Sequence, residues 1–179
     1  MASKALRGAL LVGTALAAAA AIAVLSLTGR RPETELSRFE AAGPMLAIPV
    51  ERVMEVEIRA GNQHWRFERA EGHWRAGEGT PSAGFAAHVD AGLRFLHLSA
   101  PEARLPAAEL ERTFFAEAGL DPPHYVVSAR TDDARTLTVA FGTPSPRGLA
   151  QYARVGEERD ILLLPRYVGE AWEAATGLR

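Results

Sequence analysis

The sequence contains no cysteine among its 179 residues. This absence excludes a disulfide bond, a thiolate nucleophile, a cysteine-ligated metal and a lipid-attachment cysteine. The chain also has no excess of basic residues, because its formal net charge is −2. Surfaces that bind nucleic acid are normally clustered and basic, so nucleic acid is not expected as a partner.

What the sequence does have is a run of 22 uncharged residues from Gly8 to Gly29. A helix of about 20 apolar residues spans the hydrocarbon layer of a bilayer, whereas the apolar part of a secretory signal is usually about 7 to 15 residues long. We therefore predict a transmembrane helix over residues 8–29, surrounded by the lipid bilayer. A cleaved signal peptide is the alternative, because the alanine-rich sequence at 15–21 could supply the small residues of a cleavage site.

The charges before this run predict its orientation. Lys4 and Arg7 precede it, and a short basic tail ahead of an N-terminal apolar segment normally stays in the cytoplasm. Long downstream domains are translocated largely regardless of their charge. The sequence thus predicts a cytoplasmic tail at 1–7, a single-pass anchor in a bacterial inner membrane, and a C-terminal domain in the periplasm.

Small residues recur at four-residue spacing within the predicted span. Such a ridge lets a second membrane helix approach closely, because helices in lipid associate through packing rather than through the hydrophobic effect. The candidate packing positions are Gly13, Ala15, Ala17, Ala19 and Ala23. The alternative is that alanine is simply abundant in this chain.

Residues 30–49 are interpreted as a linker, and residues 50–179 suffice for one extracytoplasmic domain with its own core. From Met54 to Ile58, apolar residues alternate with charged ones, which is typical of a half-buried strand. The alternation continues after two turns. The sequence predicts a three-stranded meander that points three aromatic side chains toward the core, namely Trp65, Phe67 and Trp74.

Helical spacing follows the meander. Ser82 is a candidate N-cap for an amphipathic helix, and Pro106 is a candidate first residue of a second helix that Gly119 would end in a left-handed conformation. Alternation then predicts two hairpins, at 125–141 and 149–164, before a short final helix. The expected fold class is α+β, one domain of antiparallel sheet with helices covering one face, preceded by the N-terminal transmembrane helix.

Two proline-containing loops are candidates for a partner surface, because rigid exposed loops make contacts at little entropic cost. One is the elbow Asp121, Pro122 and Pro123, and the other carries Pro144 and Pro146. Tyr152 and Arg154 are added, because Tyr and Arg are enriched at binding hot spots and both are expected on the outer face of their strand. The alternative is that these loops are ordinary connections.

Several of these segments resemble a known family. They are the strand pair with Trp65 and Trp74, the element Gly119-Leu120-Asp121-Pro122-Pro123, the segment Leu137 to Gly142, and Gln151-Tyr152-Ala153-Arg154-Val155. Together, over roughly residues 50–176, they are similar to the bacterial family catalogued as domain of unknown function 4340. The resemblance implies an exported or membrane-anchored protein, and some members resemble companions of ABC-type transport and gliding-associated systems. The family offers no established catalytic residues to carry over.

No catalytic residue, cofactor-binding residue or metal ligand is predicted. The five histidines lack partners at ligand spacing, and no lysine follows the glycine-containing loop at 77–82, as a phosphate-binding loop would require. Glu55 and Glu57 share an exposed strand face without apolar surroundings that would raise a pKa. The first hypothesis is therefore a non-catalytic accessory or scaffold protein that docks onto a larger membrane complex or transporter. The alternatives are a periplasmic module that binds a solute or envelope polysaccharide, with Trp65, Trp74 or Tyr152 stacking on it, and an envelope hydrolase.

Overall fold

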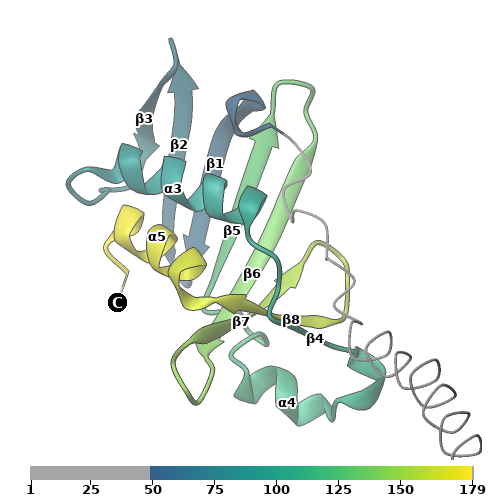
Figure 1. Cartoon of the computed structure of the whole chain (residues 1–179). Helices are drawn as coiled ribbons and strands as arrows, with labels where there is room; N and C mark the ends of the chain where they lie inside the picture. The colour runs from purple at the N-terminus through teal and green to yellow at the C-terminus, as the bar shows by residue number, and fades with distance from the viewer. Residues whose placement is uncertain (1–48, 179) are drawn as a thin grey trace, which may run out of the picture. The chain divides into compact units, whose positions relative to one another are not determined.

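The computed structural model describes residues 49–178, which contain an eight-stranded antiparallel sheet and three α-helices. The strands lie in the order β3-β2-β1-β5-β6-β7-β8-β4, and β7, β8 and β4 run crosswise to the longer strands (Figure 1). The strands are β1 (Val53–Ala60), β2 (Gln63–Ala70), β3 (His73–Glu78), β4 (Ala103–Leu105), β5 (Tyr125–Thr131), β6 (Thr136–Pro144), β7 (Ala150–Val155) and β8 (Ile161–Pro165). The helices are α3 (Phe85–Leu98), α4 (Arg112–Glu117) and α5 (Arg166–Thr176), with 3-10 turns η1 (Val50–Arg52) and η2 (Ala107–Glu109).

The predicted meander is confirmed as β1, β2 and β3. Ile58 lies opposite Trp65 and Val56 lies opposite Phe67, so these side chains share one face of the sheet. Trp65, Phe67 and Trp74 are all buried, as the alternation predicted. The predicted hairpins are also confirmed, as β5 with β6 and as β7 with β8.

Helices α3 and α5 pack together over this buried face (Figure 1). Trp172 of α5 is fully buried between the layers. A side chain at Gly92 of α3 would lie 2.6 Å from the Trp172 ring, so glycine at this position permits the close packing of the two helices. The main core therefore lies between one face of the sheet and this helix pair.

The expectation that the helices cover a single face is wrong for α4. This helix caps a second, smaller core on the opposite face, formed by Ala118, Leu120, Ala140 and Ile161 with partly buried neighbours such as Phe114. Alternation along β6 explains this arrangement, because Val139 and Phe141 face the main core while Ala140 between them faces the second. Burying apolar residues on both faces requires cover on both sides.

The second predicted helix is also shorter than expected. Pro106 adopts an extended conformation rather than a helical one, and it follows a strand that was not predicted, β4. The helix α4 begins only at Arg112. Gly119 has a φ of +64°, which confirms the predicted left-handed end of this helix.

Ser82 does not cap α3 as predicted. The N-cap is Gly84, whose φ is +74° and which makes no side-chain capping bond. The Ser82 hydroxyl instead donates to the carbonyl oxygens of Ala174 and Ala175 in α5. The side chain therefore joins the loop before α3 to α5, which is distant in sequence, and local sequence does not indicate this contact.

The predicted tail, span and most of the linker (residues 1–48) lie outside the described residues. Within residues 49–178, no helix combines the length and the apolar character needed to cross a bilayer.

Candidate interaction surface

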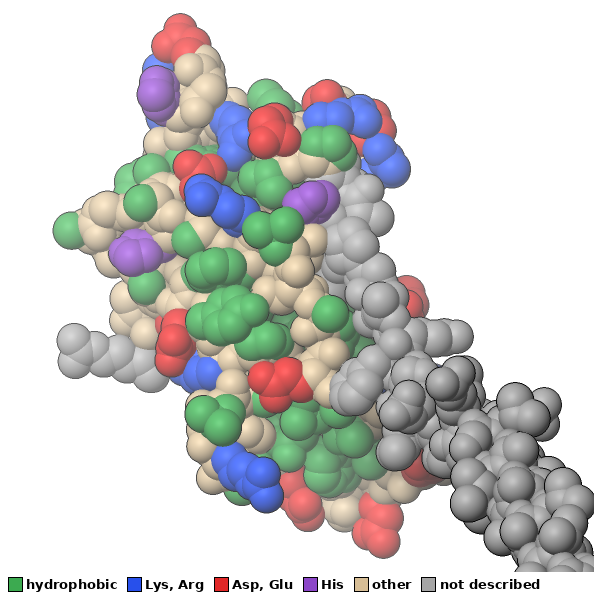
Figure 2. Space-filling model, in the orientation of Figure 1, with side chains coloured by type: hydrophobic (Ala, Val, Ile, Leu, Met, Phe, Trp, Pro, Cys, Tyr) green, Lys and Arg blue, Asp and Glu red, His purple; other side chains and the backbone are tan. Residues whose placement is uncertain are grey.

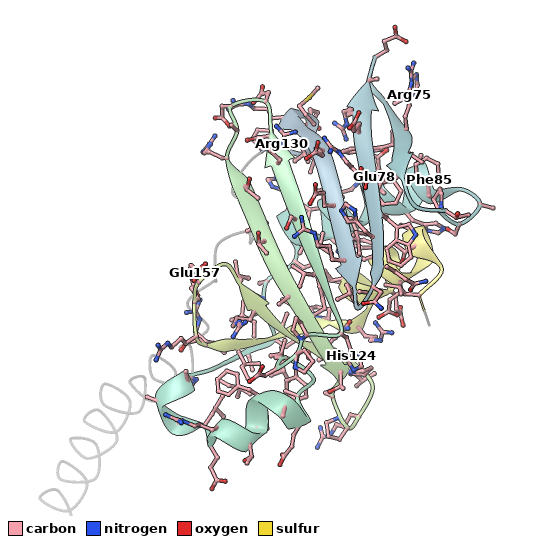
Figure 3. The ribbon with its side chains drawn as sticks, turned by 180° about the vertical axis from the view of Figure 1, so that it is seen from behind. Arg75, Glu78, Phe85, His124, Arg130 and Glu157 are labelled. Atoms are coloured by element: carbon pink, nitrogen blue, oxygen red, sulfur yellow. The ribbon has the colours of Figure 1, made fainter. Side chains whose placement is uncertain are left out.

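The two proline-containing loops predicted as a partner surface meet at one end of the sheet. The Thr143 amide donates to the carbonyl of Ala118 over 2.8 Å, and the His124 amide donates to the carbonyl of Phe141 over 2.9 Å. These bonds hold the elbow against the end of β6. His124 marks this end of the sheet in Figure 3. We call residues 121–124 and 144–149 the proline end.

Close packing at this junction depends on Gly142. A Cβ at this position would lie 2.0 Å from the Ala118 carbonyl oxygen, which is far inside contact distance. The clash is with backbone, so no side-chain rotation would relieve it. Gly142 thus permits the elbow to lie directly against β6.

The loop from Pro144 to Leu149 is fixed by its own hydrogen bonds. The Ser145 amide donates to Ala150 over 2.8 Å, and the Gly148 amide donates back to Ser145 over 2.8 Å. The Leu149 carbonyl accepts from the Arg166 amide over 2.9 Å, which joins the loop to the start of α5. The Leu149 side chain is nevertheless 71% exposed. An apolar side chain displayed on a held loop can make contacts with little loss of conformational freedom on binding.

A buried polar network lies behind this loop and orients the strands that carry it. The Gln151 amide donates to the carbonyl of Gly142 over 2.9 Å, and Arg166 donates to the Gln151 side-chain oxygen over 2.9 Å. Arg166 also pairs with Glu173 at 2.5 Å. The Tyr125 hydroxyl completes the network by donating to the carbonyl of Gly169 over 3.2 Å.

The network positions strands and α5 relative to one another and is not suited to proton transfer. Burial, together with the nearby Glu173 carboxylate, raises the pKa of Tyr125 well above its ordinary value, so the phenol stays neutral. The Arg166 guanidinium forms an ion pair with Glu173, and the hydrogen bond to that carboxylate raises the pKa of Arg166 above its ordinary value. The paired Arg166 and Glu173 side chains, together with Gln151 and Tyr125, fix the ends of β5, β6 and β7 relative to α5.

The structure brings together most of the predicted partner residues but not all. Asp121, Pro122, Pro144 and Pro146 are exposed at the proline end, and Pro123 is partly exposed there. The Asp121–Pro122 peptide bond is cis.

Tyr152 and Arg154 lie apart from this group, on β7. The Tyr152 ring is partly buried and meets Phe114 edge-on, with ring centroids 5.6 Å apart. It belongs to the second core rather than standing exposed, because α4 covers this part of the sheet. Arg154 lies opposite Ala140 and is also partly buried. The helix-packing residues Gly13, Ala15, Ala17, Ala19 and Ala23 lie outside the described residues.

Sequence reasoning missed Leu149 as part of this surface. The residue was expected to begin a strand, but β7 starts one residue later, at Ala150. The only local signal in the sequence was the glycine before it. In the structure, Gly148 has a φ of +71°, ends a tight turn and leaves Leu149 on the loop. His124, exposed between the elbow and β5, was likewise not singled out for this surface.

The remaining open sheet face carries a charge ladder across β2, β1 and β5 (Figure 3). Its centre is Glu55, which is buried between the guanidinium groups of Arg66 and Arg130 at 2.5 and 2.8 Å. The hydrogen bond from Arg130, reinforced by Arg66, holds the pKa of Glu55 below its ordinary value despite the opposing effect of burial. Such a carboxylate is a poor proton donor or acceptor near neutral pH. It is suited to holding neighbouring strands together.

No group of three or more His, Cys, Asp or Glu side chains in residues 49–178 is placed to hold a metal ion. Trp65 and Trp74, the stacking candidates of the solute-binding hypothesis, are buried and so cannot stack on a ligand. Comparisons of the chain with models of protein families, with curated proteins and with solved structures find no match. Function is therefore inferred from the chain's own sequence and geometry.

Proposed function

We propose that this chain is a non-catalytic accessory protein, anchored in a bacterial inner membrane by residues 8–29, whose periplasmic domain docks onto a larger membrane protein complex or transporter. The proline end is the docking surface. The observation that carries the proposal is that two loops, distant in sequence, are held by backbone hydrogen bonds at the end of β6, and that one of them displays the exposed side chain of Leu149. Surfaces organised in this way suit protein recognition, because they lose little freedom on binding.

The anchor adds a second support for this role. A tether of about 20 residues limits how far the domain can move from the membrane, which favours a partner that is itself in the membrane. Small residues within the predicted span, among them Ala15 and Ala19, are suited to packing against a partner helix. Docking could thus involve both the helix and the domain, and the two contributions can be separated.

The test is native mass spectrometry of the tagged full chain, extracted from its host in mild detergent. A photo-crosslinking side chain at position 149 is used in parallel to identify the protein that contacts the proline end. We expect one stoichiometric membrane protein to appear in both measurements. Leu149→Asp should remove it, while Met54→Ser, which alters an exposed apolar residue on β1, should retain it.

Two results would contradict the proposal. One is a chain that elutes alone in every gentle detergent and yields no crosslinked product. The other is a partner that is retained at full stoichiometry in Leu149→Asp, since binding would then occur elsewhere on the chain. Removal of residues 1–29 distinguishes the two contact regions, because loss of the partner on truncation alone would assign the interface to the membrane helix.

A further inference from the structure

A groove of about 720 Å³ lies where the described chain begins, between η1 and the second half of α3. Pro49 and Val50 line it on the side of η1, and Arg94, His97 and Leu98 line it on the side of α3. Pro49 is also where the linker joins the domain. The groove therefore lies beside the point at which the chain leads back toward the predicted membrane span.

Some charged side chains around the groove are paired within the domain and others are not. Asp90 accepts from Arg69 over 3.1 Å and from the Trp74 indole over 2.8 Å, so this acidic residue is already satisfied. Arg94, in contrast, is exposed and forms no ion pair within residues 49–178. Its long side chain can extend its cationic end toward an anionic group beyond the surface. The other acidic residue of the lining, Glu51, lies on η1 and, like Arg94, is exposed and forms no ion pair within residues 49–178.

An apolar patch adjoins the groove at the end of α3. Leu98 is 71% exposed and Tyr167 of α5 is 46% exposed, and both are large hydrophobic side chains. The Tyr167 ring meets Phe95 edge-on at 4.9 Å, and its hydroxyl bonds to Ser99 at 2.9 Å. Figure 2 shows hydrophobic side chains gathering over the end of α3 and the start of α5. We call Pro49, Val50, Arg94, Leu98 and Tyr167 the tether surface.

We propose that the tether surface contacts the outer leaflet of the membrane, with Leu98 and Tyr167 at the headgroup boundary and Arg94 at the lipid phosphates. The inference depends on the anchor of the proposed function and adds a second contact with the same bilayer. These side chains suit the boundary between headgroups and acyl chains. Leucine inserts into the acyl region, tyrosine lies at the level of the headgroups, and arginine extends its charge to the lipid phosphates. The linker joins the domain at Pro49, within this surface, so a contact here with the bilayer needs no long stretch of linker to pass around the domain.

The absence of cysteine permits a matched experiment. Leu98→Cys and Leu149→Cys each introduce one label site, and the two native side chains are equally exposed, at 71%. Each full-length variant is labelled with an environment-sensitive fluorophore and reconstituted into vesicles of phosphatidylethanolamine and phosphatidylglycerol. We expect the label at 98 to shift to shorter wavelength and to lose emission when the lipids carry brominated acyl chains, and the label at 149 to do neither.

Variants on the same background separate contact with lipid from contact with protein. Arg94→Glu should reduce the quenching at position 98, and a label at Tyr167→Cys should repeat the result obtained at 98. Tryptophan fluorescence during denaturation checks that each variant is folded. The inference is overturned if the 98 label stays in water, or if it leaves water without quenching by brominated lipid, because a protein or a second copy would then cover it.

Failure of the anchor is distinguishable from failure of this inference. Washing the vesicles with alkaline carbonate leaves an integral protein in the membrane and removes a peripheral one. A chain that resists washing while its 98 label remains unquenched keeps the anchor and refutes the tether-surface contact. A chain that is washed away refutes the anchor, and quenching of its 98 label before washing then decides the tether-surface contact separately.

Discussion

Replacing Gly142 by alanine should destabilise the domain and loosen the proline end. The added Cβ would lie 2.0 Å from the Ala118 carbonyl oxygen and 3.1 Å from its carbonyl carbon, so the elbow would have to move away from β6. Overpacking of this kind typically costs about 1–3 kcal/mol. The movement also weakens the bond from the Thr143 amide to Ala118, which contributes about 0.5–1.5 kcal/mol.

Together these effects predict a loss of about 2–4 kcal/mol in the free energy of unfolding, or very roughly 10 °C in Tm for a domain of this size. The measurement is guanidinium denaturation of the full chain in mild detergent, followed by tryptophan fluorescence. All three tryptophans lie in the described domain, at Trp65, Trp74 and Trp172. Hydrogen exchange at the Thr143 amide should accelerate in the same variant.

Gly77→Ala is the matched control. A Cβ at Gly77 would meet its nearest atom at 3.5 Å, which is ordinary contact, and no left-handed conformation is required there. Its midpoint should stay close to that of the wild type. Equal midpoints for Gly142→Ala and Gly77→Ala would refute the reasoning, because they would mean that the elbow is not packed against β6.

Three further changes test the core and the charge ladder. Tyr125→Phe should lower the free energy of unfolding by about 1 kcal/mol, since it removes a buried hydroxyl that donates to a carbonyl of α5; an unchanged denaturation midpoint would contradict this. Trp172→Ala should lower the free energy of unfolding by about 3–5 kcal/mol, and Trp172→Phe should lower it by much less. The reason is that the indole N–H has no acceptor within residues 49–178, so its removal offsets part of the lost packing. Equal losses in the two variants would contradict this. The folded pKa of Glu55 is lowered by Arg130, so its contribution to stability is present above the ordinary value of 4.5 and declines as the pH falls through the folded pKa. Glu55→Gln should be less stable at pH 7 and should show a flatter decline below pH 4.5, and parallel pH profiles of the two midpoints would argue against this role.

The strands were predictable because their signals are local. In β1 from Val56 to Ile58 and in β2 from His64 to Glu68, polar and apolar residues alternate, and a short turn pairs the two strands. At the start of β1 the alternation misleads, because a register shift between Val53 and Glu55 leaves Met54 exposed. The segment that becomes β5 was also recognisable as a strand. Its predicted and observed limits agree, at Tyr125 and Thr131.

The side of the sheet on which α4 packs was not predictable from such patterns. Ala140 is small and lies between two larger apolar residues, so the sequence does not reveal that its face is also buried. The role of Ser82 was hidden for a related reason. Its partners, Ala174 and Ala175, lie more than 90 positions away, whereas a cap is judged from the next three residues.

The candidate surface was half predictable. Proline marks both loops as rigid, but their meeting depends on the pairing of Thr143 with Ala118, which no local pattern contains. The exposure of Leu149 depends on the strand beginning one residue late. Tyr152 failed as a surface residue because the helix that covers it, α4, was expected on the other face.

The tether surface and the proline end place different demands on a partner. With the linker alone, residues 30–48 could extend up to about 65 Å, so the domain would sample a wide volume above the membrane. Contact of Leu98 and Tyr167 with lipid would remove most of that freedom. A domain of this length has a radius of gyration of about 14 Å, so the proline end would then be held within roughly 40 Å of the bilayer. Confinement of this kind raises the effective concentration of Leu149 at a fixed distance from the bilayer. It therefore favours a partner whose docking site lies on the membrane-proximal part of its periplasmic surface.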